Sequence, residues 1–318
     1  MTQSILNPPE PEPEDDSIAV AGVVVGMLTA AAFGTGGFYF INDRSGSMGS
    51  VLFGLLPVAT GFATALVVRG RRLIISSIFL GALLCTGILV LTGMEGWVCV
   101  LMSAPLIAVG LTIGALLGAL FRRLVIDKTR KKHLATLLML AVLPFFLMGA
   151  NKAEEESRRT PRFETFTNTL LVDGPRDHVW NQLKTFDQIK GSKGLLMTIG
   201  LPVPVSCTMS GEGIGATRTC YFESGHIEER VTEWNPPTSM KLEIVAFDVP
   251  GRPWLSFKDA SYDLTQEGDR TLITRKTTIV SRLSPAWYWR SMEKIGVETE
   301  HEYLFEEVKR RVNGAKPQ

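Results

Sequence analysis

Charged side chains are missing from five long stretches in the first half of this chain, at residues 18–41, 51–68, 73–92, 97–121 and 134–150. A helix needs roughly 20 apolar residues to cross the hydrocarbon core, within a range of about 17 to 25. All five stretches reach that range, whereas buried helices of soluble proteins are usually shorter and carry polar residues on one face. The pattern therefore predicts an N-terminal all-α transmembrane bundle of five helices over residues 18–150, a multi-pass membrane protein.

The predicted spans also contain no ionisable residue, although a coupled transporter usually buries at least one charge at mid-membrane. This absence argues against a proton- or ion-coupled carrier. Gly110, Gly114 and Gly118 instead recur at four-residue spacing in the fourth stretch. Small residues at this spacing let two helices approach closely. We expect these glycines to serve helix packing rather than to line a pore, and a homo-oligomer could form through the transmembrane helices.

Several recognisable chemistries are missing as well. The sequence has no HExxH, nucleophile elbow or phosphate-binding loop, and its Gly-rich GEGIG run joins two strands rather than opening a helix. Four cysteines without further ligands at metal spacing make a zinc site improbable. No basic patch with interleaved aromatics is present, so nucleic acid is not an expected partner. No cofactor or metal is implied, no catalytic residue can be assigned, and a non-enzymatic role is favoured.

The positions of Lys and Arg predict the orientation, because cytoplasmic loops are enriched in them. Residues 1–17 form an acidic, Pro-rich tail that we expect to be disordered. With five spans, the tail shares its side with the nine basic residues in 69–72 and 122–132, against five on the other side, at 44, 152, 158, 159 and 162. This predicts a cytoplasmic N-terminus and an extracytoplasmic C-terminal domain in the cell membrane. If 134–150 fails to span, the domain moves to the cytoplasm.

Beyond residue 150 the composition changes to that of a soluble domain. A charged linker at 151–162 precedes a strand at 163–172 and a helix that starts near Pro175. Six further strands are expected at 203–210, 216–223, 226–234, 240–249, 255–265 and 271–283, separated by Gly, Pro and Asn turns. One long helix at 285–312 closes the chain. An antiparallel sheet needs its apolar face covered, and only the long helix can cover it, which predicts an α+β helix-grip domain over 163–313.

Two segments carry a resemblance to a known superfamily. GEGIGATRTCYFESGHIEERVTEWNPPTSMKLEIV resembles the central hairpins of START-like (SRPBCC, polyketide cyclase/dehydrase) domains, and LSPAWYWRSMEKIGVETEHEYLFEEVKRRV resembles their terminal helix. The resemblance covers about 163–312 and implies a cavity between sheet and helix. It specifies function poorly, because the superfamily includes lipid carriers, hormone receptors, cyclases and hydrolases. The chain departs from the pattern at Glu229-Arg230-Val231, where relatives have Glu-Pro-Ile, and at Glu298, where a second His is common.

Alternation along 226–231 places Glu229 on the same face as Ile227 and Val231, toward the sheet's inside. A carboxylate among apolar neighbours is costly unless it is paired, and Arg218 on the neighbouring strand is the candidate partner. The pair is either a polar anchor at the bottom of an apolar ligand cavity or a structural cross-strand ion pair.

His301 shares a face of the terminal helix with Val297, Leu304 and Val308, which points it toward the sheet. It is either a general acid or base or, as the residue pattern favours, a hydrogen-bonded core histidine. Aromatic side chains, chiefly Trp289 on that helix and Tyr262 on a strand, would line the cavity mouth, lie at the membrane interface or pack in the core.

Cys207 and Cys220 flank the Gly211–Gly215 turn almost symmetrically, so a hairpin centred there would place them opposite each other. We expect either a disulfide or two facing buried thiols; a one-residue slip in register would separate them.

These observations support three hypotheses. The first is a membrane-anchored START-like domain that binds a lipid or another hydrophobic small molecule, with membrane lipids as partners and with His301, Glu229, Arg218, Trp289 and Tyr262 around the ligand. The second is a cyclase- or hydrolase-like enzyme acting on a hydrophobic substrate. The third is a non-catalytic sensor or scaffold.

Overall fold

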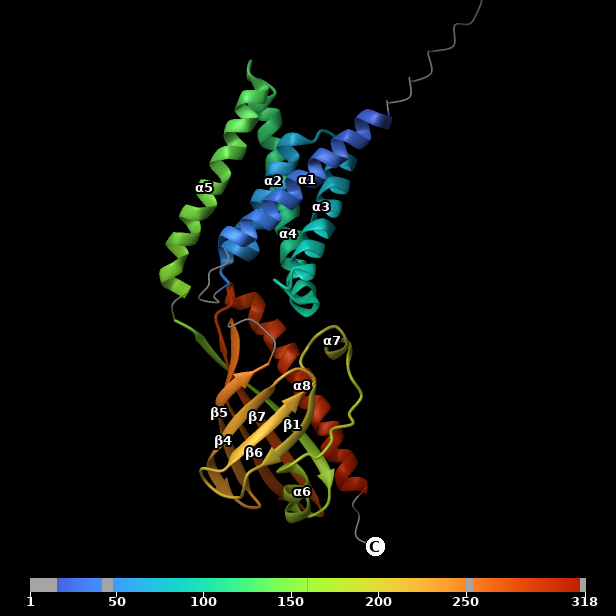
Figure 1. The fold of residues 1–318 in the computed structure, drawn as a ribbon, viewed down its shortest axis with the longest axis vertical. Helices are drawn as coiled ribbons and strands as arrows, with labels where there is room; N and C mark the ends of the chain where they lie inside the picture. The colour runs from blue at the N-terminus through green and yellow to red at the C-terminus, as the bar shows by residue number, and fades with distance from the viewer. Residues whose placement is uncertain (1–15, 42–47, 159, 250–253, 315–318) are drawn as a thin grey trace, which may run out of the picture. The chain divides into compact units, whose positions relative to one another are not determined.

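A computed structural model describes residues 16–41, 48–158, 160–249 and 254–314 (Figure 1). The acidic tail expected at residues 1–17 lies almost entirely outside these ranges. The chain divides into two compact units: the first holds residues up to 41 together with 54–92 and 106–149, and the second holds residues from 150 onward with the short segments 42–53 and 93–105. Each unit is described by itself.

The first unit is all helical. It holds α1 (Asp16–Ile41), α2 (Leu56–Val67), α3 (Arg71–Leu91) and most of α4 (Trp97–Phe121) and α5 (Lys132–Arg158), with a π-helical turn at Arg122–Ile126. The start of α4, the end of α5 and most of a second π-helical turn, Val51–Leu55, belong to the second unit. Four helical segments are long and apolar enough to cross a membrane, whereas Val51–Val67 is shorter. At 1.5 Å per residue, 17 helical residues extend about 25 Å, less than a hydrocarbon core of about 30 Å. The expected count of five spans is therefore not confirmed.

The glycines of α4 pack against α2. A Cβ atom added to Gly114 would lie 1.9 Å from the carbonyl oxygen of Val58, and one added to Gly118 would lie 2.6 Å from that of Phe62. The approach is reciprocal, since a Cβ on Gly61 of α2 would meet the carbonyl of Leu111 at 2.2 Å. Helix packing through the glycine stripe is thus confirmed, and within one chain the stripe is already covered.

Arg122 closes the end of α2. Its side chain is buried, and Nη1 donates hydrogen bonds to the carbonyl oxygens of Ala65, at 2.6 Å, and Val68. The last carbonyls of a helix have no partner within the helix, and they carry the negative end of its dipole. A buried cation at this position therefore satisfies the end of α2 and explains why a charged residue directly after a span is taken out of solvent.

The charged linker expected at 151–162 is mostly helix. α5 continues without interruption through Pro144 to Arg158, and the first strand begins at Arg162. The segment NKAEEESR contains good helix formers, so the hydrogen bonds of α5 extend into it although its side chains are polar. The run of charge therefore does not mark the end of the helix.

The second unit contains one seven-stranded sheet, in which all neighbouring strands are antiparallel in the order β1-β7-β6-β5-β4-β3-β2. The strands are β1 (Arg162–Asp173), β2 (Pro204–Met209), β3 (Thr217–Phe222), β4 (His226–Asn235), β5 (Ser239–Asp248), β6 (Leu255–Glu267) and β7 (Arg270–Ser281). β2 to β7 form a meander, and β1 pairs with its last strand. The bounds lie within two residues of those predicted from alternation and turn residues.

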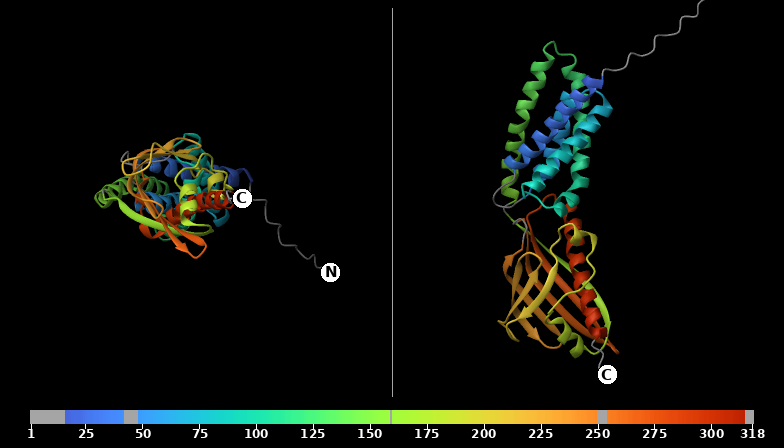
Figure 2. Two further views of the ribbon diagram at one scale, coloured as in Figure 1. Left: turned by 90° about the horizontal axis from the view of Figure 1, so that it is seen from below. Right: turned by 45° about the vertical axis from the view of Figure 1, so that its right-hand side comes forward.

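The long helix α8 (Ala286–Gly314) lies along the sheet, and the short helices α6 (Arg176–Leu183) and α7 (Leu195–Thr198) complete the unit. Both views in Figure 2 show the strands curving beside α8. The main core joins the buried face of the sheet to α6 and to Tyr303, Leu304, Phe305 and Val308 of α8. The expected α+β helix-grip arrangement, an antiparallel sheet gripping one long C-terminal helix, is therefore confirmed.

Candidate functional site

A buried ion pair lies on the inner face of the sheet. In the register of β3 and β4, Arg218 stands directly opposite Glu229, and its Nη1 donates to Oε2 of Glu229 over 3.1 Å. Arg218 is only 2% exposed and Glu229 9%. Burial alone would lower the pKa of Arg218, but the charge of Glu229 and the nearby Tyr262 outweigh it and raise the pKa, so the guanidinium stays charged.

A second buried arginine, which the sequence analysis did not single out, lies across the sheet. Arg275 of β7 is 7% exposed, and its Nη2 reaches both carboxylate oxygens of Glu300 on α8, at 2.9 and 3.0 Å. Alternation along β7 could have indicated it, because Ile273, Thr277 and Ile279 are buried on the same face. Its pKa is also raised, because Glu300 and Tyr262 outweigh the effect of burial.

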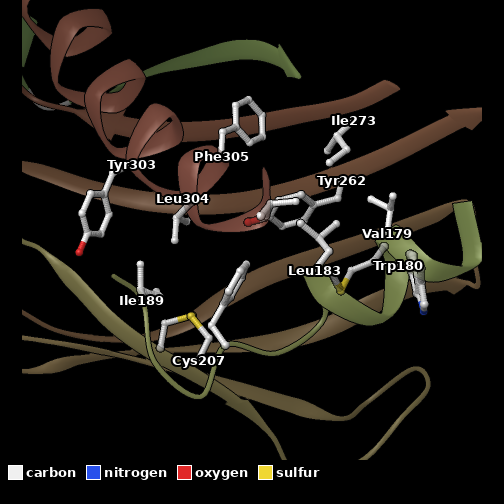
Figure 3. Close-up of a cluster of buried hydrophobic side chains, with 14 of the residues drawn as sticks. Val179, Trp180, Leu183, Ile189, Cys207, Tyr262, Ile273, Tyr303, Leu304 and Phe305 are labelled. Carbon is white, nitrogen blue, oxygen red and sulfur yellow. A yellow bond between two sulfur atoms is a disulfide. The ribbon is translucent and has the colours of Figure 1, made fainter. Parts of the chain in front are cut away.

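Tyr262 of β6 joins the two arginines. The Cζ atoms of Arg218 and Arg275 lie 5.8 and 5.3 Å from the centre of its ring, within the range of cation–π contact. Figure 3 shows the ring among apolar side chains, with Val179 and Leu183 of α6 on one side and Leu304 and Phe305 of α8 on the other. Two cations therefore share one aromatic ring in the centre of an otherwise apolar core.

The pairing of these arginines is incomplete. Nε and Nη2 of Arg218, and Nε and Nη1 of Arg275, are buried and have no hydrogen-bond partner among the residues that the structure describes. Leaving a buried donor unsatisfied costs about 1–3 kcal/mol, and more for a charged group. The cluster of Arg218, Glu229, Tyr262, Arg275 and Glu300, called the arginine cluster below, can therefore still donate to acceptors that the protein does not provide.

His301 is next to this cluster but is fully engaged. It is 0% exposed, its Nε2 lies 2.7 Å from Oγ1 of Thr277, and its Nδ1 lies 2.7 Å from Oδ1 of Asn168. Burial, together with the charge of Arg275, lowers its pKa to about 2. A neutral ring that donates from Nδ1 to Asn168 and accepts at Nε2 from Thr277 satisfies both nitrogens. The geometry is that of a core histidine that fixes α8 against β1 and β7.

The second unit has the helix-grip architecture of START-like domains. Solved structures resemble it at low sequence identity. The match to norcoclaurine synthase from Thalictrum flavum has 12% identity and a TM-score of 0.35, and it covers 51% of this chain and 92% of the synthase chain. The match to the aromatase/cyclase Zhui from a Streptomyces species has 15% identity and a TM-score of 0.34, and it covers 49% of this chain and 100% of Zhui. The match to the di-domain aromatase/cyclase BexL has 14% identity and a TM-score of 0.35, and it covers 64% of each chain.

No family model matches the chain, and no curated protein matches it. The fold assignment therefore rests on the strand order and on α8. The low identities and TM-scores of the structural neighbours carry no conclusion about activity.

Trp289 is not part of the arginine cluster. Twelve residues of helix separate it from His301, a rise of about 18 Å. It is buried within the second unit against Phe53, with ring centres 4.7 Å apart, and edge-on to Tyr288 at 5.4 Å. Of the five candidate ligand residues, the structure brings together Arg218, Glu229 and Tyr262, places His301 beside them and leaves Trp289 apart.

Cys207 and Cys220 are opposite each other in the register of β2 and β3, and their sulfur atoms form a disulfide. β2 also receives the segment after α6, because Phe186 exchanges two backbone hydrogen bonds with Cys207, at 2.7 and 2.8 Å. The disulfide thus fixes the edge of the sheet to which Phe186 is attached.

Two carboxylates on α8 hold the helix in place at either end of the cluster. Glu293 accepts hydrogen bonds from Nη1 and Nη2 of Arg162 on β1, over 2.9 and 2.8 Å. Glu307 is fully buried; burial would raise its pKa, but hydrogen bonds from Arg310, from the backbone N–H of Lys190 and from Arg311 lower it. These contacts are saturated, unlike those of the arginine cluster.

An open pocket of about 380 Å³ lies at the C-terminal end of α8, lined by Gln182, Asp187, Gln188, Lys190, Arg310, Arg311 and Gly314. One of these residues connects it to the core: Cζ of Arg311 lies 5.0 Å from the centre of the Phe186 ring, and Cζ of Arg218 lies 5.9 Å from the same centre. A single aromatic side chain is therefore in contact with both the pocket and the arginine cluster.

Proposed function

We propose that this protein is a membrane-anchored binding protein for an amphiphilic small molecule. The apolar part of the ligand would lie between the sheet and α8, and its polar head would contact the arginine cluster. The observation that carries the proposal is Arg218, which is 2% exposed and charged and, among the described residues, hydrogen-bonded through only one of its three nitrogens. The apolar surroundings would supply affinity at about 25 cal/mol per Å² of buried apolar surface.

Stability alone does not account for this cluster. Removing two charges from water is expensive, and replacing a buried ion pair by apolar residues of similar volume is often neutral or stabilising. Here two such pairs meet in the core, and each leaves donors unsatisfied. A role as the polar anchor of an otherwise apolar binding site would account for these buried charged residues.

The enzymatic alternative finds less support. It assigned acid–base catalysis to His301, but a general base needs an available nitrogen and a pKa near the working pH. Both ring nitrogens of His301 are engaged, and its pKa lies at about 2. The scaffold hypothesis, in which the core holds no ligand, is the outcome to be distinguished by experiment.

We also propose that the second unit is extracytoplasmic. α5 is a continuous helix whose segment Lys132–Glu155 is long and apolar enough to span. The side of the domain relative to the basic loop at 122–132 depends on α5 alone. If Val51–Val67 does not cross, the N-terminal tail changes side but the domain does not. With the basic loop in the cytoplasm, the domain lies outside in both cases, where a disulfide persists.

Native mass spectrometry of the full chain, released from detergent after purification from membranes, tests the binding proposal. We expect one retained adduct per chain with the mass of an amphiphile. Arg275→Met should lose the adduct, because it removes half of the polar anchor. Lys276→Met is the matched control, since Lys276 is the next residue on β7, is half-exposed and pairs with Asp263 at the surface. A bare chain, with no adduct even after incubation with a lipid extract, would favour the scaffold hypothesis.

A further inference from the structure

We infer that the head group bound by the arginine cluster is a carboxylate, held side-on by Nε and Nη2 of Arg218; this deepens the proposed function and rests on it. The inference starts from which nitrogens are free. Glu229 is bonded to Nη1, whereas Nε and Nη2 have no partner among the described residues. The open donors of Arg218 are therefore not scattered but form one complete edge of the guanidinium.

That edge has a specific shape. The N–H groups of Nε and Nη2 project in parallel from the same side of the planar guanidinium. Two parallel donors match the two oxygens of a carboxylate or phosphate in a bidentate pair, which is geometrically selective and stronger than a neutral hydrogen bond. A hydroxyl or a single carbonyl offers only one oxygen and leaves part of the edge unsatisfied.

The charge balance selects between the two anions. Arg218 and Arg275 contribute two positive charges, Glu229 and Glu300 two negative charges, and His301 is neutral. A carboxylate adds one negative charge, which the remaining donors of Arg275, Nε and Nη1, can also stabilise. A phosphate would add up to two negative charges to a buried and otherwise neutral cluster, where unpaired charge is very costly.

Phe186 is the side chain that must move to admit such a ligand. Its ring contacts Arg218 on the core side and Arg311 at the open pocket. Its backbone is fixed to Cys207, which the disulfide holds in turn. Entry from this side requires the Phe186 ring to rotate. The pocket is lined by Lys190, Arg310 and Arg311 together with Asp187, and Glu307 pairs with both arginines, which leaves a small excess of positive charge to attract an anion.

The test uses two probes that differ only in the head, decanoate and decan-1-ol, binding to the full chain in lipid nanodiscs stripped of co-purified amphiphile. We expect decanoate to bind about 10- to 100-fold more tightly, because hydrogen bonds between charged groups exceed those of a neutral head. Arg218→Lys keeps a cation for Glu229 but removes the paired edge. It should abolish the preference for decanoate over decan-1-ol, whereas Lys276→Met, on the exposed face of β7, should keep that preference.

The outcomes separate the two claims. If both probes bind equally and Arg218→Lys changes neither, the protein binds amphiphiles but the carboxylate inference is wrong. If decyl phosphate binds more tightly than decanoate, the charge argument is wrong. If no probe binds, the proposed function itself fails. Phe186→Leu, which keeps an apolar side chain of smaller width, should speed decanoate exchange several-fold; an unchanged exchange rate would exclude the entrance at Phe186.

Discussion

Nδ1 of His301 on α8 lies 2.7 Å from Oδ1 of Asn168 on β1. With Thr277 on the other ring nitrogen, the bond ties the long helix to two adjacent strands. His301, which the sequence offered as a general acid or base, is here part of the packing. The consequence is a stability that depends on pH through a histidine that cannot be protonated without breaking the core.

The pH dependence of unfolding should reveal this neutral histidine. Its pKa is about 2 in the folded protein and about 6.5 when unfolded. The unfolded chain therefore binds one more proton below pH 6.5, and the stabilisation present above that pH is lost as the pH falls. Between pH 7 and 5 the loss amounts to about 2 kcal/mol. Urea unfolding at both pH values should show this loss in the wild type and not in His301→Gln.

His226→Gln gives the control, because it removes a half-exposed histidine and leaves the contacts of His301 with Asn168 and Thr277 in place. If His301→Gln and the wild type lose the same free energy between pH 7 and 5, His301 is accessible to protons and its role must be revised.

Breaking the buried pair should cost far more than breaking a surface pair. Arg218→Met leaves Glu229 without its cation, and Glu229→Leu leaves Arg218 without its anion; each should lower the free energy of unfolding by about 3–5 kcal/mol. The double variant should recover much of this loss. The exposed pair Lys276–Asp263, 3.4 Å apart, should change stability by less than about 1 kcal/mol. Additive losses in the buried cycle would contradict the pairing.

The disulfide predicts a specific labelling pattern. Under denaturing, non-reducing conditions a maleimide should modify Cys85 and Cys99, whose thiols are not in a disulfide, and should reach Cys207 and Cys220 only after reduction. The bridge spans 13 residues, and removing it with Cys207→Ser and Cys220→Ser together should cost about 3 kcal/mol. Labelling of four cysteines before reduction would show that the thiols are reduced in the cell.

The glycine stripe of α4 can be tested with one methyl group. Gly114→Ala places a Cβ 1.9 Å from the Val58 carbonyl oxygen, so the helices must separate. We expect a loss of about 1–3 kcal/mol and a lower melting temperature in detergent. Gly87→Ala in α3, whose Cβ would meet nothing within 4 Å, is the matched control. Equal melting temperatures for the two variants would mean that α2 and α4 do not pack closely.

The orientation follows from α5 and can be measured with reporters. Alkaline phosphatase fused after residue 314 should be active, because it folds only where disulfides form, and the same enzyme inserted at residue 129 should be inactive. The opposite pattern would place the second unit in the cytoplasm. A reporter at the N-terminus would then decide whether Val51–Val67 crosses.

Much of the second unit was predictable from local pattern. Alternation along β4 placed Glu229 inward, and the symmetry of Cys207 and Cys220 about a Gly turn set the register of β2 and β3. These properties depend on residues close in sequence, where periods of two and turn residues are informative.

The remainder depends on contacts between distant segments. Arg275 points inward by the same alternation. The apolar face of α8 predicts that His301 points toward the sheet, but not that the adjacent Glu300 reaches Arg275. Aromatic character alone groups Trp289 with Tyr262, but Tyr262 lies in the main core whereas Trp289 packs against Phe53 and Tyr288. In the first unit, Val51–Val67 has the composition of a span but begins with a π-helical turn and is short.

The central claim is that the arginine cluster binds the head of an amphiphile, and an experimental map of the full chain purified from membranes tests it most directly. The account predicts elongated density between α8 and the sheet that ends in two oxygen positions within hydrogen-bonding distance of Nε and Nη2 of Arg218. Isolated water molecules on those nitrogens, in a core otherwise filled by side chains, would contradict it.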